Sequence, residues 1–367
     1  MNILIICRCL GIGGAERVAS IWANGLQKAG HHVLILTNTS SPVTYYINPQ
    51  IKIISSNYDL HDSDNLIKDI NKRISYVNQI KNLIDDKSID VIIKVMHVNS
   101  IELLFAKILS KRKPPIIMTD HNTYERPVSA PMTISAKFQK FWINRYFDKV
   151  TVLTQRDKEI TNRHHLQNVE VLHNPVSLIP IETENIEREN IVLAVGRLDS
   201  WHVKGFDNLV KAWNVVGAKH PGWKLRIVGK GKKSTKDYLQ SLSSNSEQLE
   251  LAEFNENVTE EYRQAQIFVL SSRYEGWGLV LVEAMSQGCA CIACDYFGRQ
   301  AEIIEDHKNG ILCKPDDVES LAKNIDKLIS DTQLRSYLQQ NAPKNIERFS
   351  EYNVTRKLLK IINRVIK

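Results

Sequence analysis

The chain has 367 residues, 43% of them hydrophobic and 24% charged, which is the composition of a folded protein large enough for two hydrophobic cores. No apolar run approaches the roughly 20 residues of a membrane-spanning helix. The N-terminal stretch "MNILIICRCLGIGG" contains Arg8 and has no basic leader, so we expect a cytoplasmic protein without a signal peptide.

The formal charge of +7 is unevenly distributed. Residues 1–175 hold 22 lysines and arginines against 15 aspartates and glutamates, whereas residues 176–367 hold 26 of each. Such asymmetry indicates an anionic partner for the first half of the chain only.

Short β-branched runs alternate along the chain with longer amphipathic segments. In the first half, we expect elements at residues 2–9, 13–30, 31–38, 65–87, 90–96, 100–111, 114–122, 133–147 and 149–155. In the second half, we expect them at 190–198, 205–219, 224–231, 235–243, 249–254, 267–273, 279–287, 289–296, 310–313 and 317–329. This order predicts an α/β protein whose parallel sheets are joined by right-handed crossovers.

The polar stretch "HNPVSLIPIETENIEREN" separates the two series of elements and contains Pro175 and Pro180, as a hinge between domains would. We therefore expect two facing, Rossmann-like, doubly wound domains with a cleft between them. A helix at the C-terminus should pack back on the first domain. The expected divisions are residues 1–175, 176–345 and 346–367.

Glycines follow the first expected strand, and ligands of open parallel sheets bind beyond the carboxyl ends of strands. Gly13 and Gly14 open a helix there, so backbone N–H groups could approach an anion, although tight packing is an alternative reason for the glycines. A dinucleotide site is disfavoured for two reasons. "GIGGAE" lacks the third glycine of G-x-G-x-x-G, and the second strand ends in Thr37 and Asn38 instead of an acidic residue.

Two cations stand at another strand end. Arg197 comes just past an apolar strand and Lys204 follows on the same loop, so both could balance a diphosphate while a bond to it breaks. Two solvated surface charges are the alternative interpretation. A helix that begins near Leu279 would direct its positive N-terminus to the same region, which favours an anion.

The stretch "SSRYEGWGLVLVEAMSQG" carries two glutamates, eight positions apart. Glu275 lies in a strand-end loop, where a carboxylate can accept hydrogen bonds from hydroxyls, and Gly276 and Gly278 let the backbone pass close to a ligand. Glu283 should lie roughly 6–9 Å along the helix, at about 1.5 Å per residue. A structural glutamate with an ion-pair partner is the alternative for Glu283. Hydroxyls on both sides of a diphosphate describe a nucleotide sugar.

The chain resembles the retaining glycosyltransferases of family 4, which have the two-domain GT-B fold. "GGAER", "HNPV", "GRL…KGFDNLVKAW", "IVGKG" and the E-x7-E element occur in the family's order over nearly the whole chain. The resemblance implies transfer of a hexose or N-acetylhexosamine from a nucleotide diphosphate sugar to a saccharide acceptor, with retention of configuration. The expected pathway is surface polysaccharide or glycan biosynthesis, such as capsule or lipopolysaccharide. The first domain would bind the acceptor and the second the donor, with uracil as the expected base.

The same resemblance implies a role for each candidate residue. Arg197 and Lys204 would bind the donor diphosphate, Glu275 the sugar hydroxyls and Glu283 the nucleotide ribose. His121, at a strand end in "MTDHN", would face the transferred sugar. Catalysis is thereby assigned to Glu275, His121, Arg197 and Lys204. The other expected donor contacts are Gly13, Gly14, Gly229, Gly276, Trp277, Gly278 and Leu279.

No metal or other cofactor is expected. The cationic pair can replace a metal, no Asp-x-Asp motif lies nearby, and the departing phosphate oxygen would take the acceptor's proton in a front-face reaction. Cys289, Cys291 and Cys294 lack a second Cys or His pair at zinc spacing, so they are interpreted as core residues. "FGRQAEII" departs from the family, because Arg299 replaces a frequent proline. A nucleotide-sugar epimerase of the same fold and a non-catalytic nucleotide-sugar binder are the alternative functions.

Segment 133–147 interleaves basic and aromatic residues, and this pattern leads to a prediction of where the acceptor binds. On a helix, Phe138, Phe141, Trp142 and Arg145 would share one face, beside Lys137 and Lys140. A stripe facing the core is the alternative interpretation. With the basic cluster at residues 111–113, the segment predicts peripheral attachment to the anionic inner face of the plasma membrane and a lipid-linked acceptor, of the undecaprenyl-diphosphate type. No nucleic acid partner is expected.

Overall fold

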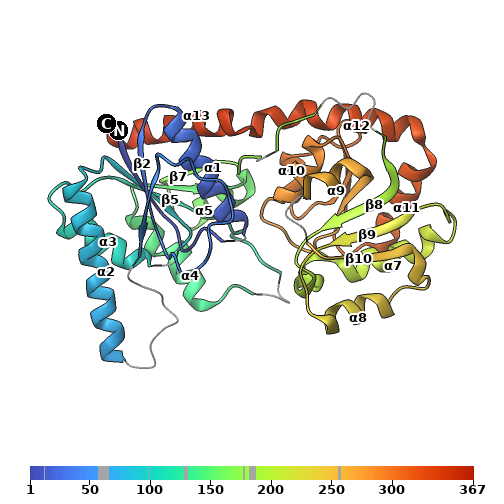
Figure 1. The fold of residues 1–367 in the computed structure, drawn as a ribbon, viewed down its shortest axis with the longest axis horizontal. Coiled ribbons are helices and arrows are strands. Elements are labelled where there is room, and N and C mark those ends of the chain that lie inside the picture. The colour runs from blue at the N-terminus through green and yellow to red at the C-terminus, as the bar shows by residue number, and fades with distance from the viewer. Residues whose placement is uncertain are drawn as a thin grey trace. The chain divides into compact units, whose positions relative to one another are not determined.

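The computed structural model describes residues 1–11, 13–56, 66–97, 99–127, 131–176, 178–181, 187–254 and 258–367. It shows two compact units (Figure 1). Unit 1 comprises Met1–Pro175 together with Glu351–Lys367, and unit 2 comprises Val176–Ser350. Residues 177 and 182–186 of the expected hinge lie outside the described part of the chain.

Unit 1 is built on a parallel seven-stranded sheet with the order β3-β2-β1-β4-β5-β6-β7. The order reverses between β1 and β4, which is the switch point where ligands of doubly wound sheets bind. The strands are β1 (Asn2–Ile6), β2 (His32–Thr37), β3 (Lys52–Ser55), β4 (Val91–Val95), β5 (Ile116–Thr119), β6 (Lys149–Val152) and β7 (Val169–Val171).

Helices cover both faces of this sheet (Figure 1). They are α1 (Gly14–Lys28), α2 (Leu66–Asp86), α3 (Ser100–Leu109), α4 (Ile134–Phe141), the 3-10 helix η1 (Ile143–Tyr146), α5 (Gln155–Arg163) and α13 (Glu351–Ile366). Leu4 and Ile6 pack against α2 and α3 in one core. α1 and α13 pack so closely that a Cβ atom at Gly25 would lie 2.4 Å from Thr355 Oγ1.

Unit 2 repeats the architecture with a parallel six-stranded sheet of order β10-β9-β8-β11-β12-β13. Its strands are β8 (Glu189–Val195), β9 (Lys224–Val228), β10 (Leu249–Ala252), β11 (Ala265–Leu270), β12 (Ala290–Cys294) and β13 (Ile311–Cys313). Its helices are η2 (Leu198–Ser200), α6 (Trp201–Lys204), α7 (Phe206–Gly217), α8 (Lys233–Ser241), η3 (Ser246–Gln248), α9 (Val258–Gln264), α10 (Leu279–Ser286), η4 (Gln300–Glu302), α11 (Val318–Ser330), α12 (Thr332–Ile346) and η5 (Glu347–Phe349). Two doubly wound parallel sheets confirm the predicted α/β fold class.

The cysteines in and directly before β12 belong to the core of unit 2, as expected. Cys289, Cys291 and Cys294 are buried, and burial raises the pKa of Cys289 to about 11 and that of Cys294 to about 12. Thiols with such pKa values stay protonated and unreactive at neutral pH. In the described part of the chain, no three His, Cys, Asp or Glu side chains form a group that could hold a metal ion.

The prediction of one helix over 133–147 is wrong beyond Phe141. α4 ends there and η1 follows after a break at Trp142. Phe141 packs on the core of unit 1, and Phe147 and Lys140 are buried, so these three side chains do not belong to an exposed face. The apolar side chains left exposed on the segment are Ile134, Phe138, Trp142 and Tyr146.

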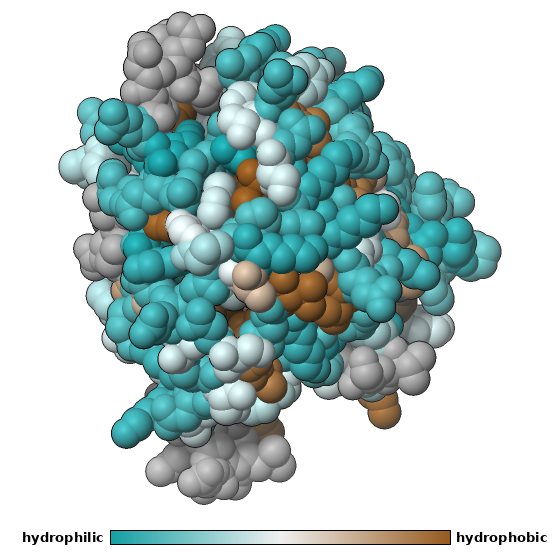
Figure 2. Space-filling model, turned by 90° about the vertical axis from the view of Figure 1, so that its right-hand side faces the viewer, coloured by the Kyte–Doolittle hydropathy of each residue, from teal (hydrophilic) through white to brown (hydrophobic). Residues whose placement is uncertain are grey.

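The two units differ in where their exposed apolar side chains lie. The face of unit 2 in Figure 2 is mainly hydrophilic, with small separate apolar spots. In unit 1, exposed apolar side chains recur on α3 as well as on α4 and η1. Among the described residues, no helix combines the length and hydropathy that a membrane span requires.

Candidate active site

The candidate site of unit 2 lies where two adjacent parallel strands end. β8 pairs with β11, so the loops that follow them are neighbours although β9 and β10 intervene in sequence. Arg197 follows β8 and is exposed. Within the described part of the chain, its guanidinium has no hydrogen-bond or ion-pair partner, so it is available to an anion.

Lys204 and Glu275 form an ion pair with 2.6 Å between Nζ and Oε2. Their side chains are 23% and 19% exposed, so both remain accessible to a ligand. The hydroxyl of Ser272 donates to the same carboxylate oxygen over 3.5 Å. The family resemblance implies that Lys204 binds the donor diphosphate and that Glu275 binds the sugar hydroxyls. The structure brings these two side chains into direct contact.

A second ion pair fixes the loop that carries Lys204. Arg273 binds both carboxylate oxygens of Asp207, at 2.7 and 2.8 Å, and its backbone N–H donates to Val203. Burial would raise the pKa of Asp207, but the hydrogen bonds and charge of Arg273 hold it below its ordinary value. The Ser271 hydroxyl also donates to the Lys204 carbonyl over 2.8 Å. Sequence reasoning missed Arg273 and Asp207, whose only signal was a charge at a strand end and another in the first turn of a helix.

Gly278 and Leu279 form the start of α10, as predicted. Gly278 has φ of 92°, a left-handed conformation that strongly favours glycine, and its carbonyl accepts from Leu281 N–H. The neighbouring Trp277 is buried, and its ring meets that of Phe349 edge-on with centroids 5.1 Å apart. The indole of Trp277 therefore supports the loop from inside the fold, so a donor contact at this position would involve backbone atoms. Gly276 lies half-buried between Glu275 and Trp277.

Glu283 is only 2% exposed and lies in the middle of α10. The buried hydroxyl of Tyr262 donates to its Oε2 over 3.0 Å. This bond supplies a partner that a carboxylate in an apolar helix needs. The ribose contact of Glu283 stays a prediction.

Gly229 shapes the site from the neighbouring strand. It follows β9, and a Cβ atom there would lie 1.8 Å from the carbonyl oxygen of Gly196. The adjacent Lys230 carbonyl accepts from Leu198 N–H over 2.8 Å. Glycine is required here because the loops after β8 and β9 touch, and this contact sets the position of Arg197.

Unit 1 presents its candidates at the carboxyl edge of its own sheet. Gly13 N–H donates to the Tyr45 hydroxyl over 3.2 Å, and Gly14 begins α1. The guanidinium of Arg17 lies 5.0 Å from the centre of the Tyr45 ring. Tyr45 was not among the predicted site residues, because it lies in a loop whose sequence shows neither helical nor strand periodicity.

His121 follows β5 and is held on both ring nitrogens. Its Nδ1 lies 2.9 Å from Asn174 Oδ1, and its Nε2 lies 3.1 Å from Thr119 Oγ1. An amide oxygen can only accept, so Nδ1 carries the hydrogen. Burial lowers the pKa of His121 to about 4, so the ring is neutral at pH 7. The ring also packs against Trp22 of α1, with centroids 5.5 Å apart.

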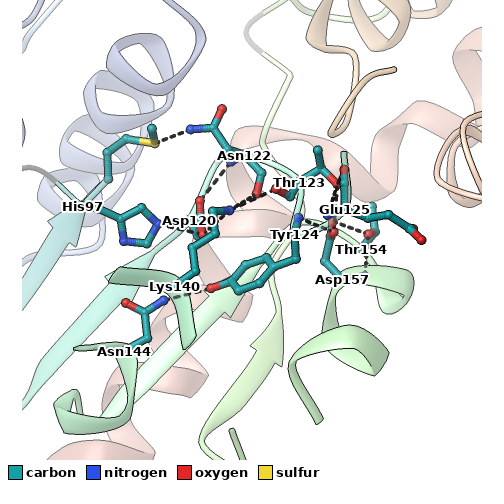
Figure 3. A network of polar contacts seen from close by, with 11 residues as sticks. His97, Asp120, Asn122, Thr123, Tyr124, Glu125, Lys140, Asn144, Thr154 and Asp157 are labelled. Atoms are coloured by element: carbon teal, nitrogen blue, oxygen red, sulfur yellow. Dashed lines mark hydrogen bonds and ion pairs between the residues drawn. The ribbon is translucent and has the colours of Figure 1, made fainter. Parts of the chain in front are cut away.

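The residue beside His121 is the centre of a buried polar network (Figure 3). Asp120 Oδ2 lies 2.8 Å from both Lys140 Nζ and His97 Nε2, and Oδ1 accepts from Asn122 N–H over 3.0 Å. Burial would raise the pKa of Asp120, but His97 and Lys140 hold it well below its usual range. This pairing explains why Lys140 is not a surface cation. His97 was not predicted, although it also follows an apolar strand, as His121 does.

A second buried carboxylate fixes the chain beyond His121. Asp157 Oδ1 accepts from Tyr124 N–H over 2.9 Å, and Oδ2 accepts from the Thr154 hydroxyl over 2.7 Å (Figure 3). Arg156 holds Glu125 through two hydrogen bonds of 3.0 and 2.8 Å. The loop after β5 is thus anchored on both sides, which keeps His121 at the sheet edge.

Comparison with known proteins connects these features to a family. Residues 12–178 match the family described as Glycosyltransferase Family 4, and residues 179–345 match that described as Glycosyl transferases group 1. The chain is 29% identical over 362 residues to the amylovoran biosynthesis glycosyltransferase AmsD of Erwinia amylovora, which is 96% of each chain. It is 27% identical over 377 residues to the GalNAc-alpha-(1->4)-GalNAc-alpha-(1->3)-diNAcBac-PP-undecaprenol alpha-1,4-N-acetyl-D-galactosaminyltransferase of Campylobacter jejuni, covering 100% of this chain and 99% of that one.

The solved structure of Anabaena HepE in complex with UDP is similar over 99% of this chain and 100% of HepE, with a TM-score of 0.79 at 16% identity. This similarity shows the shared GT-B fold. The chain therefore belongs to the family 4 glycosyltransferases, and it is an enzyme that transfers a sugar from a nucleotide-sugar donor to a saccharide acceptor. The predicted family, fold and enzyme class are confirmed, whereas the roles of individual site residues stay predictions.

Proposed function

We propose that this enzyme is a retaining glycosyltransferase that moves a hexose or N-acetylhexosamine from a UDP-linked donor to a lipid-linked saccharide at a membrane surface. The observation that carries the donor half is the unpartnered Arg197 beside the accessible Lys204–Glu275 pair at the carboxyl edge of a doubly wound sheet. Two cations beside a carboxylate match a diphosphate joined to a hydroxyl-rich ring. The UDP bound to HepE and the undecaprenol-linked substrate named for the Campylobacter relative support the choice of donor and acceptor.

The proposed chemistry needs charge stabilisation more than a strong base. As the bond between the anomeric carbon and the phosphate oxygen breaks, negative charge grows on the departing phosphate. Arg197 and Lys204 balance that charge, so we propose that no metal ion is required. The acceptor hydroxyl attacks the same face of the sugar, its oxygen bonds to the anomeric carbon, and its proton passes to the departing phosphate oxygen.

Glu275 has the role of an orienting group in this scheme. Its carboxylate is held by Lys204 and by the Ser272 hydroxyl, which fixes the direction of its lone pairs. When the diphosphate attracts Lys204, Glu275 becomes available to the sugar hydroxyls. His121 is neutral at pH 7 and can only exchange hydrogen bonds, so it would contact the sugar without protonating it.

The membrane half of the proposal rests on the surface of unit 1. Eight large apolar side chains are exposed on α3, on α4 and η1 and at Trp142 between the last two, and α3 contacts η1. We call these eight the apolar face: Ile101, Phe105, Ile108, Leu109, Ile134, Phe138, Trp142 and Tyr146. Exposed basic residues accompany it: Lys111, Arg112, Lys113, Lys137 and Arg145.

Charge favours an anionic bilayer as the occupant of the apolar face. Unit 1 contains 27 lysines and arginines against 16 aspartates and glutamates, a net of +11. Each basic residue near an anionic leaflet is worth about 1 kcal/mol, and apolar side chains at the interface add to that. The guanidinium of Arg145 lies 4.9 Å from the Trp142 ring, so charge and apolar surface are adjacent.

The transferase proposal is tested by incubating the enzyme with UDP-sugars and lipid-linked saccharides and following UDP release. UDP should appear only when an acceptor is present, activity should survive EDTA, and NMR should show an α-linked product from an α-linked donor. A donor epimerised without acceptor would instead favour the epimerase, and donor binding without any turnover would favour the non-catalytic binder.

Flotation with vesicles tests the membrane proposal separately. The enzyme should float with phosphatidylglycerol vesicles and not with neutral ones, and high salt should release it. Phe105→Ser combined with Trp142→Ser should abolish flotation, whereas Tyr337→Ser, at a residue 49% exposed on unit 2, should not. An enzyme that stays unbound to both vesicle types contradicts the membrane proposal and favours a water-soluble acceptor.

A further inference from the structure

The loop after β12 adjoins the candidate donor site within unit 2. β12 pairs with β11 in parallel, so the chain after β12 leaves the sheet beside the loop of Glu275. The side-chain amide of Gln300 donates to the Trp277 carbonyl over 3.4 Å. The ring of Tyr296 lies 6.2 Å from that of Tyr274, the residue before Glu275. Residues 295–300 therefore form one wall of the region around Glu275.

Phe297 stands out on this wall. It has φ of 55°, a left-handed conformation that is rare for a bulky side chain, and yet its side chain is 56% exposed. Its ring meets the Tyr296 ring edge-on, with centroids 4.7 Å apart. Because more than half of the Phe297 side chain is exposed, its packing contributes little stability. Packing of the core therefore does not explain why Phe297 adopts an unfavourable backbone conformation.

Other contacts enforce the conformation of Phe297. Asp295 Oδ1 accepts from the Gln300 N–H over 2.9 Å, and Tyr296 N–H donates to Gln300 Oε1 over 2.8 Å. The buried guanidinium of Arg299 donates to the Tyr296 carbonyl over 3.2 Å and lies 5.2 Å from the Tyr296 ring centre. The loop is thus held from both ends, as expected where strain serves a function.

We propose that Phe297, supported by Tyr296, forms the apolar wall of the donor-sugar subsite and stacks against the C–H face of the transferred pyranose. The inference rests on the proposed function, because it takes Glu275 as the partner of the sugar hydroxyls. A pyranose has a hydroxyl-bearing edge and an apolar face, and small-molecule sites combine a few polar groups with aromatic walls. Glu275 supplies the polar group of this subsite, and Phe297 supplies the aromatic surface beside it.

Calorimetry with UDP and with UDP-glucose, UDP-galactose, UDP-GlcNAc and UDP-GalNAc tests the subsite. For the UDP-sugar that binds best, Phe297→Ala should weaken affinity roughly 3- to 10-fold, the range expected for one lost aromatic contact. Affinity for UDP should stay unchanged, because UDP carries no sugar beyond its ribose. Phe297→Tyr keeps the ring and should bind the UDP-sugar as the wild type does.

Phe297→Gly serves as the folding control. It also removes the ring, but glycine adopts the left-handed conformation without strain, so its melting temperature should equal or exceed that of the wild type. Loss of UDP-sugar affinity in this stable variant supports the proposal. Unchanged UDP-sugar affinity in Phe297→Ala, or an equal loss for UDP and UDP-sugar, overturns it. If neither UDP nor any UDP-sugar binds the wild type, the proposed donor falls and the subsite falls with it.

Discussion

Replacing Lys204 and Glu275 separately tests the proposed diphosphate contact and the proposed sugar contact of the candidate donor site one at a time. Their Nζ and Oε2 atoms are 2.6 Å apart, and the side chains are 23% and 19% exposed. The charge of Lys204 is therefore partly neutralised by Glu275. A diphosphate that binds Lys204 competes with Glu275, so replacing Lys204 should weaken UDP binding and replacing Glu275 should not.

The expected magnitudes follow from the type of bond that each substitution removes. Lys204→Ala removes a cation whose hydrogen bonds to phosphate are worth about 1.5–3 kcal/mol each. UDP affinity and kcat/KM should both fall roughly 10- to 100-fold. Glu275→Gln removes only a partly exposed ion pair, worth about 0.2–1 kcal/mol. It should leave UDP affinity unchanged or raise it up to about fivefold, while turnover falls roughly 10-fold or more because the sugar loses a charged partner.

Calorimetry with UDP and a UDP-release assay with donor and acceptor measure the two effects. Lys219→Ala is a matched control, since Lys219 forms a 3.3 Å surface ion pair with Asp326 on the same unit, and its loss should alter neither quantity. The reasoning is refuted if Glu275→Gln weakens UDP binding as much as Lys204→Ala does. That result would mean that the pair acts as one structural unit.

Three further substitutions test other parts of the site. Glu283→Gln should weaken UDP binding roughly 3- to 10-fold by calorimetry, because the ribose hydroxyls exchange a charged acceptor for a neutral one, and the protein should stay folded, because Tyr262 can still donate to the amide oxygen. Gly229→Ala places a Cβ atom 1.8 Å from a carbonyl oxygen, so denaturant titration should show about 1–3 kcal/mol less stability, and UDP affinity should fall as Arg197 moves. His121 has a pKa of about 4, below its unfolded value of 6.5, so it contributes stability that is present above pH 6.5 and lost as the pH falls through 4. His121→Asn should therefore reduce the drop in melting temperature between pH 7 and pH 4, because the variant lacks the contribution of His121, whose loss lowers the free energy of unfolding by at most about 3 kcal/mol over this range.

Most of the fold could be predicted because buried parallel strands have continuous apolar sequences rich in β-branched residues, as in β1 and β8. β3 was missed, since it is a four-residue strand at the edge of its sheet that follows a loop without periodicity. The helix over 133–147 was predicted too long because no glycine or proline marks the break at Trp142. Helical spacing also could not reveal that Phe141 faces the core while Phe138 faces solvent.

The sequence predicted the individual residues of the candidate site, but it did not predict which of them contact one another. Arg197, Lys204 and Glu275 were found because each stands near a strand end and carries charge. The contact between Lys204 and Glu275 depends on strand order, and no local sequence pattern indicates that β11 lies beside β8. The same limit applies to Asp120, which pairs with a histidine that follows β4 and a lysine from α4.

The two units differ in net charge, and this difference bears on how each would bind an anionic partner. Unit 2 contains 21 lysines and arginines against 25 aspartates and glutamates, a net of −4, although it carries the candidate diphosphate site. The net charge of the unit therefore does not attract an anionic donor, which in our proposal is held by short contacts to Arg197 and Lys204. In the proposed membrane attachment, unit 1, at +11, would act on an anionic surface through many exposed charges, whose interactions salt screens beyond about 10 Å at 0.1 M. Raising the salt concentration should thus release the enzyme from anionic vesicles at concentrations that leave UDP affinity nearly unchanged, because direct charged hydrogen bonds are screened much less than distant charges.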